Sequence, residues 1–105
     1  MARLEIHFSE ATDHEWEYFV FKQEGMTGLR LPGCYLPEFV EALERPNDSE
    51  AFYFWQNHSV LNNKLGSTIS ISTMQAPLLQ LSADQRAKLI AHLRSAYAAL
   101  ISIYR

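Results

Sequence analysis

Cysteine and long apolar runs are scarce in this sequence, and both absences narrow the class of protein. The single cysteine, Cys34, cannot form a disulfide within one chain, and this usage is typical of the reducing cytoplasm. No stretch approaches the roughly 18 uncharged apolar residues of a membrane-spanning helix. The first five residues include Arg3 and Glu5, which do not fit the apolar stretch of a signal peptide. We therefore expect a cytoplasmic protein that is not inserted in a membrane.

The motifs that usually hold phosphates or metals are lacking as well. The glycines do not precede a long helix at the spacing of a phosphate-binding loop. No two of the four histidines have the close spacing of a zinc motif. His14, Glu15 and Glu17 form one local group of metal-ligating residue types, but along a strand or turn their side chains do not converge on one ion. We expect no metal, no cofactor and no catalytic residue, with Cys34 as a small buried apolar residue.

The hydrophobic pattern predicts one globular α+β domain over residues 1–105. Alternating or aromatic runs indicate strands at 3–9, 15–23, 29–31, 52–55 and 67–73. A short helix is expected at 36–45, with Pro37 at its start and Pro46 after its end. A long helix is expected at 82–104. The expected fold is an antiparallel sheet of about five strands, in the order β-β-β-α-β-β-α, packed by the two helices. The pairing of residues 57–66 is left open.

The long helix offers the most detailed local signals. Ser82 and Gln85 have the spacing of a capping box, which predicts that the helix begins there. Two apolar stripes then run along it. One stripe packs on the sheet, and the second, at a chain end where helices usually fray, suggests a homodimer or a docked partner. The expected interface residues are Ile90, Tyr97, Ile101 and Tyr104.

Charge is divided unevenly along the chain. Residues 1–50 carry eleven acids and four bases, whereas residues 51–105 carry five bases and one acid. The most acidic segment is 10–17, and within it Asp13, Glu15 and Glu17 are the expected contacts for the basic surface of another protein. The alternative interpretation is that each half simply has its own solvated faces.

Three function classes remain after these exclusions. We predict a small acidic protein-binding module without catalytic activity, such as an inhibitor, an immunity-type protein, an adaptor or a chaperone, acting as a homodimer. The first alternative is a single-stranded nucleic-acid-binding module that stacks bases on Trp16, Tyr18, Tyr53 or Trp55, beside Lys64 or Arg94. The acidic first half disfavours it, because phosphates would be repelled. The second alternative is a small enzyme or ligand-binding domain.

Overall fold

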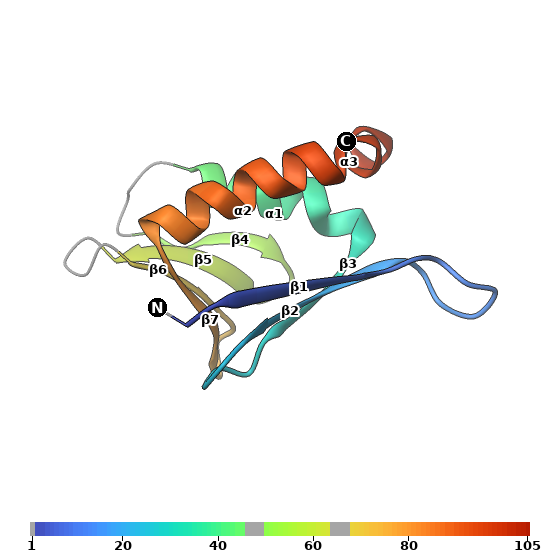
Figure 1. Ribbon diagram of the computed structural model, residues 1–105. Coiled ribbons are helices and arrows are strands. Elements are labelled where there is room, and N and C mark those ends of the chain that lie inside the picture. The colour runs from blue at the N-terminus through green and yellow to red at the C-terminus, as the bar shows by residue number, and fades with distance from the viewer. Residues whose placement is uncertain (1, 46–49, 64–67) are drawn as a thin grey trace.

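The computed structural model describes residues 2–45, 50–63 and 68–105, which form two antiparallel sheets beneath a layer of helices (Figure 1). The first sheet has the order β1-β2-β3 and the second has the order β4-β5-β6-β7. The α+β class is thus confirmed. The strands are β1 (Leu4–Ser9), β2 (Tyr18–Gln23), β3 (Leu29–Pro32), β4 (Phe52–Trp55), β5 (His58–Asn63), β6 (Thr68–Ser72) and β7 (Pro77–Ser82).

Gln23, the last residue of β2, connects the two sheets. Its side chain is 6% exposed. Its Oε1 accepts from the Gln80 backbone N–H at 2.8 Å, and its Nε2 donates to the Gln80 carbonyl at 2.6 Å. The Gln23 side-chain amide therefore makes the two hydrogen bonds with the Gln80 backbone of β7 that a neighbouring strand would make. A backbone bond from Gly28 N–H to the Leu78 carbonyl, 2.9 Å long, holds the β2–β3 turn against the same strand.

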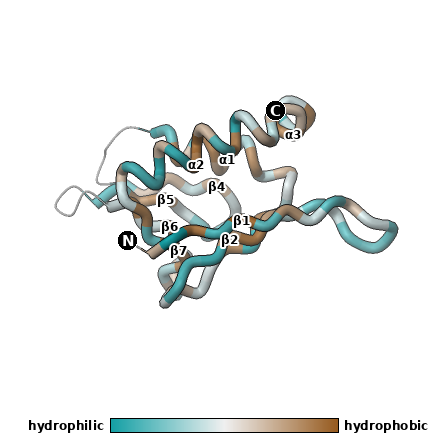
Figure 2. The backbone as a smooth tube through the Cα atoms, in the orientation of Figure 1, coloured by the Kyte–Doolittle hydropathy of each residue, from teal (hydrophilic) through white to brown (hydrophobic). Residues whose placement is uncertain are grey.

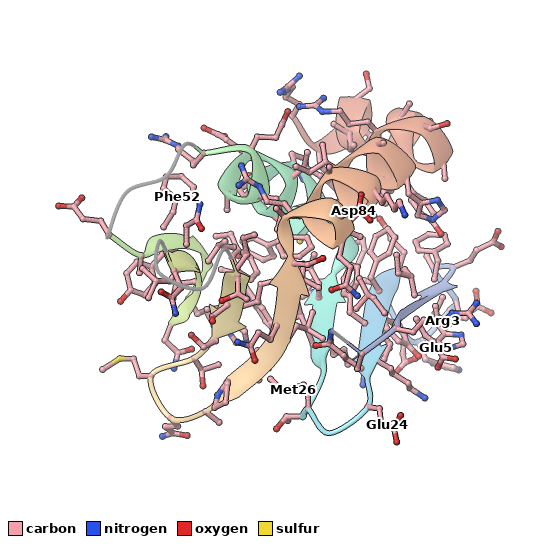
Figure 3. All side chains as sticks on the ribbon, turned by 60° about the vertical axis from the view of Figure 1, so that its left-hand side comes forward. Arg3, Glu5, Glu24, Met26, Phe52 and Asp84 are labelled. Atoms are coloured by element: carbon pink, nitrogen blue, oxygen red, sulfur yellow. The ribbon has the colours of Figure 1, made fainter. Side chains whose placement is uncertain are left out.

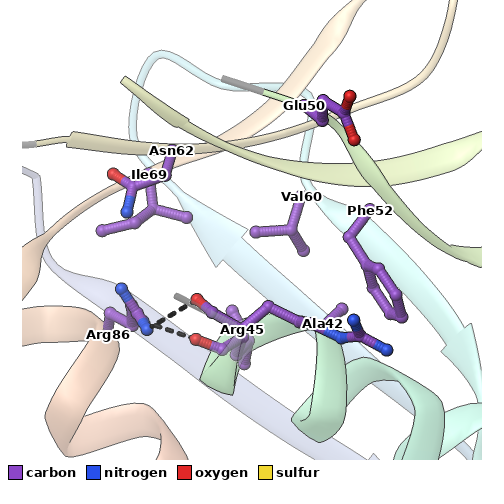
Figure 4. Close-up of a pocket in the computed structure, with 9 residues that line it drawn as sticks. Ala42, Arg45, Glu50, Phe52, Val60, Asn62, Ile69 and Arg86 are labelled. Atoms are coloured by element: carbon purple, nitrogen blue, oxygen red, sulfur yellow. Dashed lines mark hydrogen bonds between the residues drawn. The ribbon is translucent and has the colours of Figure 1, made fainter. Parts of the chain in front are cut away.

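Helices cover one side of both sheets (Figure 1). The helical elements are the 3₁₀ turn η1 (Gly33–Tyr35), α1 (Leu36–Glu44), α2 (Ala83–Ala96) and α3 (Ala98–Tyr104). The predicted capping box at the start of α2 is confirmed: Ser82 Oγ accepts from the Gln85 N–H, and the Gln85 side chain accepts from the Ser82 N–H. α2 is joined to the end of α1 by Arg86, which donates to the carbonyls of Leu43 and Arg45 (Figure 4).

The core lies between the helix layer and the sheets. Phenylalanines from β2, α1 and β4 pack ring against ring within it, with centroids 5.3 Å apart for Phe21 and Phe39 and 4.9 Å apart for Phe39 and Phe54. Ile69 and Ile71 of β6 point inward, as their alternation with serine predicts. Leu4, Ile6 and Phe8 of β1 pack against the same core from its edge.

The predicted strand count and order need correction. β7 is absent from the predicted strands because its leucines form a strand only when paired with β6, and its first residue is proline. Proline is tolerated there because it starts the strand. The open segment 57–66 contains β5, which pairs with both β4 and β6. Pro46, expected just after the first helix, and Lys64 lie outside the described residues, as does residue 67 of the strand expected at 67–73.

The predicted helix 82–104 is also wrong in one respect, because it is interrupted at Tyr97. This residue has φ −124° and ψ 30°, which is not helical. Its ring packs edge-on against Phe19, with centroids 4.8 Å apart, and lies 5.2 Å from the Phe8 ring. The interruption turns α3 toward η1 and α1, with which it makes contact. Packing of Tyr97 on β1 and β2 accounts for the break better than any feature of the local sequence.

Candidate functional site

Residues 10–17 form a loop, here called the arm, that protrudes between β1 and β2 (Figure 1). It is largely hydrophilic (Figure 2). Its tip is organised around Thr12, whose Oγ1 accepts from the N–H groups of His14 and Glu15 at 3.3 and 3.1 Å. The Thr12 N–H in turn donates to the Glu15 carbonyl at 2.8 Å. Such local bonds hold the loop in a defined turn.

The base of the arm is fixed at Glu17. The Glu17 carbonyl accepts from the Gly33 N–H at 2.9 Å, and the Tyr104 hydroxyl of α3 donates to the Glu17 carboxylate. A Cβ on Gly33 would lie 2.5 Å from Glu17 Cγ, so this close approach requires glycine. The strand predicted from residue 15 therefore begins only at Tyr18, and Trp16 belongs to the arm.

Trp16 is 81% exposed and stands between two hollows. The larger hollow, about 430 Å³, lies between the arm, β3 and Trp55 at the end of β4. The smaller, about 310 Å³, lies between the arm, η1 and the end of α3. We call this region the Trp16 surface. Its lining residues are His14, Glu15, Trp16, Glu17, Tyr18, Arg30, Pro32, Gly33, Cys34, Trp55 and Tyr104.

Ring contacts hold the far wall of the larger hollow in place. The Trp55 ring stacks on His58, with centroids 4.5 Å apart, and lies 5.8 Å from the Tyr35 ring. On the β-sheet side, the Arg30 guanidinium carbon sits 4.0 Å from the Tyr18 ring centroid. Trp55 is thus packed against rings that lie outside the lining, whereas the ring of Tyr18 is contacted by Arg30, which itself lines the hollow.

The three acidic residues predicted to meet a partner have different surroundings. Asp13 and Glu15 are exposed, and Glu15 pairs with Arg30 at 3.6 Å. Glu17 is half-buried and serves the base of the arm through Tyr104. All three lie on the arm, but their contact with a basic partner stays a prediction.

Two pKa shifts accompany this arrangement. The hydrogen bond to the Glu17 carboxylate raises the pKa of Tyr104, and desolvation adds to the rise. Desolvation also raises the pKa of the Cys34 thiol, with smaller contributions from Glu38 and Glu17. Cys34 is exposed, so its expectation as a buried residue is wrong. A raised pKa disfavours the thiolate, the nucleophilic form of cysteine.

The four residues expected at a dimer interface are divided between core and surface. Ile101 is 7% exposed and belongs to the core of its own chain. Ile90 and Tyr97 are partly buried against that core, and Tyr104 is half-buried beside Glu17. Ile103, by contrast, is 72% exposed. Self-association stays a prediction, and of this stretch Ile103 offers more surface to a second copy than Ile101 does.

The aromatic residues named for nucleic-acid stacking are only partly gathered. Trp16, Tyr18 and Trp55 line the larger hollow, whereas Tyr53, although 57% exposed, does not line it. Arg94 pairs with Glu44 on the helix layer. Sequence reasoning missed Arg30, Pro32 and Gly33 as parts of this surface, because only the fold brings β3 and η1 beside the arm.

Two of the other hollows have a different character. One, about 620 Å³, lies at the ends of β1 and β2, where Arg3, Glu5, Glu24 and Met26 surround it (Figure 3). It has charges of both signs and no aromatic lining residue. The other, beside Arg86, encloses about 20 Å³, roughly the room for one water molecule. Neither combines apolar walls with a large exposed side chain.

No group of three or more histidine, cysteine or acidic residues is placed to hold a metal ion in the described ranges. Within the same ranges, no helix is both long and apolar enough to cross a bilayer. Comparisons of the chain with family models, curated proteins and solved structures find no match.

Proposed function

We propose that this chain is a non-catalytic protein-binding module whose recognition site is the Trp16 surface. The observation that carries the proposal is the 81% exposure of Trp16 between two hollows. Tryptophan dominates the binding energy of many protein interfaces, usually from the centre of the contact. An indole left in water stabilises the fold little and gains most when a partner covers it.

The arm is also ordered before binding, which favours affinity. The bonds at Thr12, Gly33 and Tyr104 hold both ends of the segment that carries Trp16. A loop that is already in one conformation loses little conformational entropy when a partner binds. We infer that Trp16 acts as a rigid anchor.

The charge of the arm supports a basic protein as the partner. Asp13 and Glu15 precede Trp16 on the arm and are exposed, and such peripheral charges mainly accelerate encounter with an oppositely charged surface. The same charges repel phosphates, which places single-stranded nucleic acid second. The reducing cytoplasm is the compartment that we propose, since a single free thiol suits it.

Capture from a lysate of the native host tests the proposal. Wild-type protein, Trp16→Ala and the control Met74→Ala, which removes another side chain that is 82% exposed, are immobilised in parallel. A specific partner is retained by wild type and by the control and is lost by Trp16→Ala. With that partner purified, Trp16→Ala should raise Kd about 30-fold or more. An unchanged Kd contradicts the proposal.

The charges are tested separately with Asp13→Lys and Glu15→Lys combined, which leaves Glu17 and its bond to Tyr104 intact. The association rate should fall at low salt, while the dissociation rate changes little. The difference should shrink as the Debye length shortens from about 30 Å at 0.01 M to about 10 Å at 0.1 M. If neither the charge reversal nor the salt concentration changes the association rate, these acids belong to a solvated face and do not contact the partner.

We also propose that the protein self-associates through its C-terminal helix, where Ile103 is 72% exposed. Light scattering should then give twice the mass of 12.1 kDa, and Ile103→Glu should give a folded monomer. A wild-type mass of one chain across a concentration series contradicts the dimer.

A further inference from the structure

The larger hollow of the Trp16 surface combines two kinds of group that together favour cations. Three aromatic residues line it, Trp16, Tyr18 and Trp55, and so do the acidic residues Glu15 and Glu17. Ring faces attract cations through their quadrupole, tryptophan most strongly. Carboxylates beside the rings add direct ion pairing.

One wall of this hollow already holds a guanidinium group. Arg30 lies with its guanidinium carbon 4.0 Å from the Tyr18 ring centroid, and its Nη2 is 3.6 Å from Glu15 Oε1. The side chains of Arg30 and Glu15 are 62% and 56% exposed, so the pair forms at the open surface and not in a sealed core. The chain's own arginine therefore shows the kind of contact that this lining makes.

We propose that the space between Trp16 and Trp55 binds an arginine side chain from a basic segment of the partner protein. This inference rests on the proposed function and specifies the partner that the site selects. Arginine fits better than lysine because its planar guanidinium stacks flat on an indole while its edge donates to carboxylates. The arm favours a cation of either kind over a neutral or acidic group, since residues 10–17 include four acids and no lysine or arginine.

Charge complementarity also decides against other occupants. A phosphate or an acidic peptide would meet Glu15 and Glu17 in the lining. These two carboxylates already contact Arg30 and the Tyr104 hydroxyl, but two acids and one arginine still leave the lining with a net negative formal charge. A second arginine balances that charge, whereas a neutral apolar side chain does not. Each ring face should contribute about a two- to fivefold gain in affinity at such an exposed site, so a single arginine binds weakly and a basic segment binds through several contacts.

Short capped peptides of the form Gly-X-Gly test the inference without the partner, with X as arginine, lysine or citrulline. Citrulline keeps the shape of arginine and lacks its charge.

The protein has two tryptophans, so two indole N–H signals report binding by NMR, and they are assigned with Trp16→Phe and Trp55→Phe. The arginine peptide should shift both signals in a saturable way, lysine less, and citrulline least. Trp16→Ala and Glu15→Gln should each weaken arginine binding about two- to fivefold, whereas Met74→Ala should not change it.

Several results would overturn the inference. Unchanged indole signals with the arginine peptide, or equal shifts with citrulline, remove the cation site. Equal binding of lysine removes the preference for arginine, and stronger shifts with a single-stranded oligothymidylate favour nucleic acid instead. Failure here is distinguishable from failure of the proposed function. If capture of a partner still depends on Trp16 while the arginine peptide is silent, the binding module stands and its arginine specificity does not.

Discussion

Two groups of aromatic side chains in this molecule have opposite surroundings. Phe19 and Phe21 of β2 and Phe39 of α1 are fully buried in the core, whereas Trp16 of the arm and Tyr53 of β4 are 81% and 57% exposed. Burial of a large apolar side chain stabilises a fold by about 1.5–3 kcal/mol, so the first group accounts for folding and the second contributes little to it. We call the buried rings and the core around them the sealed side of the molecule, and the exposed rings the open side. On the open side, burial of the rings contributes free energy only when a partner binds.

The strongest test of this separation compares Phe39→Ala with Trp16→Ala. Phe39 contacts the rings of both Phe21 and Phe54, so its loss leaves a cavity and should lower the free energy of unfolding by about 3–5 kcal/mol. Trp16→Ala should change it by no more than about 0.5 kcal/mol. Urea unfolding followed by circular dichroism measures both. A large loss of stability in Trp16→Ala would mean that the arm is part of the folding core.

A second comparison concerns two basic residues of α2. Arg86 caps the end of α1 through two backbone carbonyls, and Arg86→Gln should cost about 1.5–3 kcal/mol, the range for hydrogen bonds to charged groups. Lys88 forms an ion pair with Asp84 in which both side chains are more than 70% exposed. Lys88→Gln should therefore cost less than about 1 kcal/mol. Equal effects in thermal unfolding would show that Arg86 does not join the helices in solution.

Local sequence signals predicted those parts of the sealed side whose structure depends on few neighbouring residues. The capping box at Ser82 and the alternation around Ile69 and Ile71 specify their own structure, and both are found. β7 was missed because Leu78, Leu79 and Leu81 become strand residues only when paired with β6. The break at Tyr97 depends on rings from β1 and β2, which no local pattern contains.

The open side was predicted less well for the same reason. The acidic residues at 10–17 predicted a partner-binding segment. The aromatic run that follows predicted a strand from residue 15, three residues before β2 begins. Gly33 and Tyr104 hold the base of the arm at Glu17, next to Trp16, and both residues are distant from the arm in sequence. Arg30 reaches the site by strand pairing, since Arg30 of β3 lies opposite Val20 of β2.

A third and smaller effect is expected at the start of α2. Ser82→Ala removes the acceptor for the Gln85 N–H and should cost about 1 kcal/mol. This corresponds to a fall in Tm of roughly 4–8 °C for a domain of this size. Ala83→Ser, one residue further along and exposed, is the control and should change Tm much less. An unchanged Tm in Ser82→Ala would place the beginning of the helix elsewhere.

The smallest expected effect concerns the bond that ties the arm to α3. The Glu17 carboxylate accepts from the Tyr104 hydroxyl and raises the pKa of Tyr104 above that of an ordinary tyrosine, about 10. Because the folded-state pKa is the raised one, the contribution of this bond to stability is complete below pH about 10. It is lost as the pH rises through the folded-state pKa.

Alkaline titration of phenolate absorbance should thus show one tyrosine that titrates late in wild type, and Glu17→Gln should bring it back to the ordinary range. Tyr104→Phe should remove that late titration altogether, while Tyr53→Phe, which removes an exposed ring away from the arm, should leave it in place. If wild type and Glu17→Gln titrate identically, the arm is not held at Glu17, and Trp16 would lose the rigid support on which its role as an anchor depends.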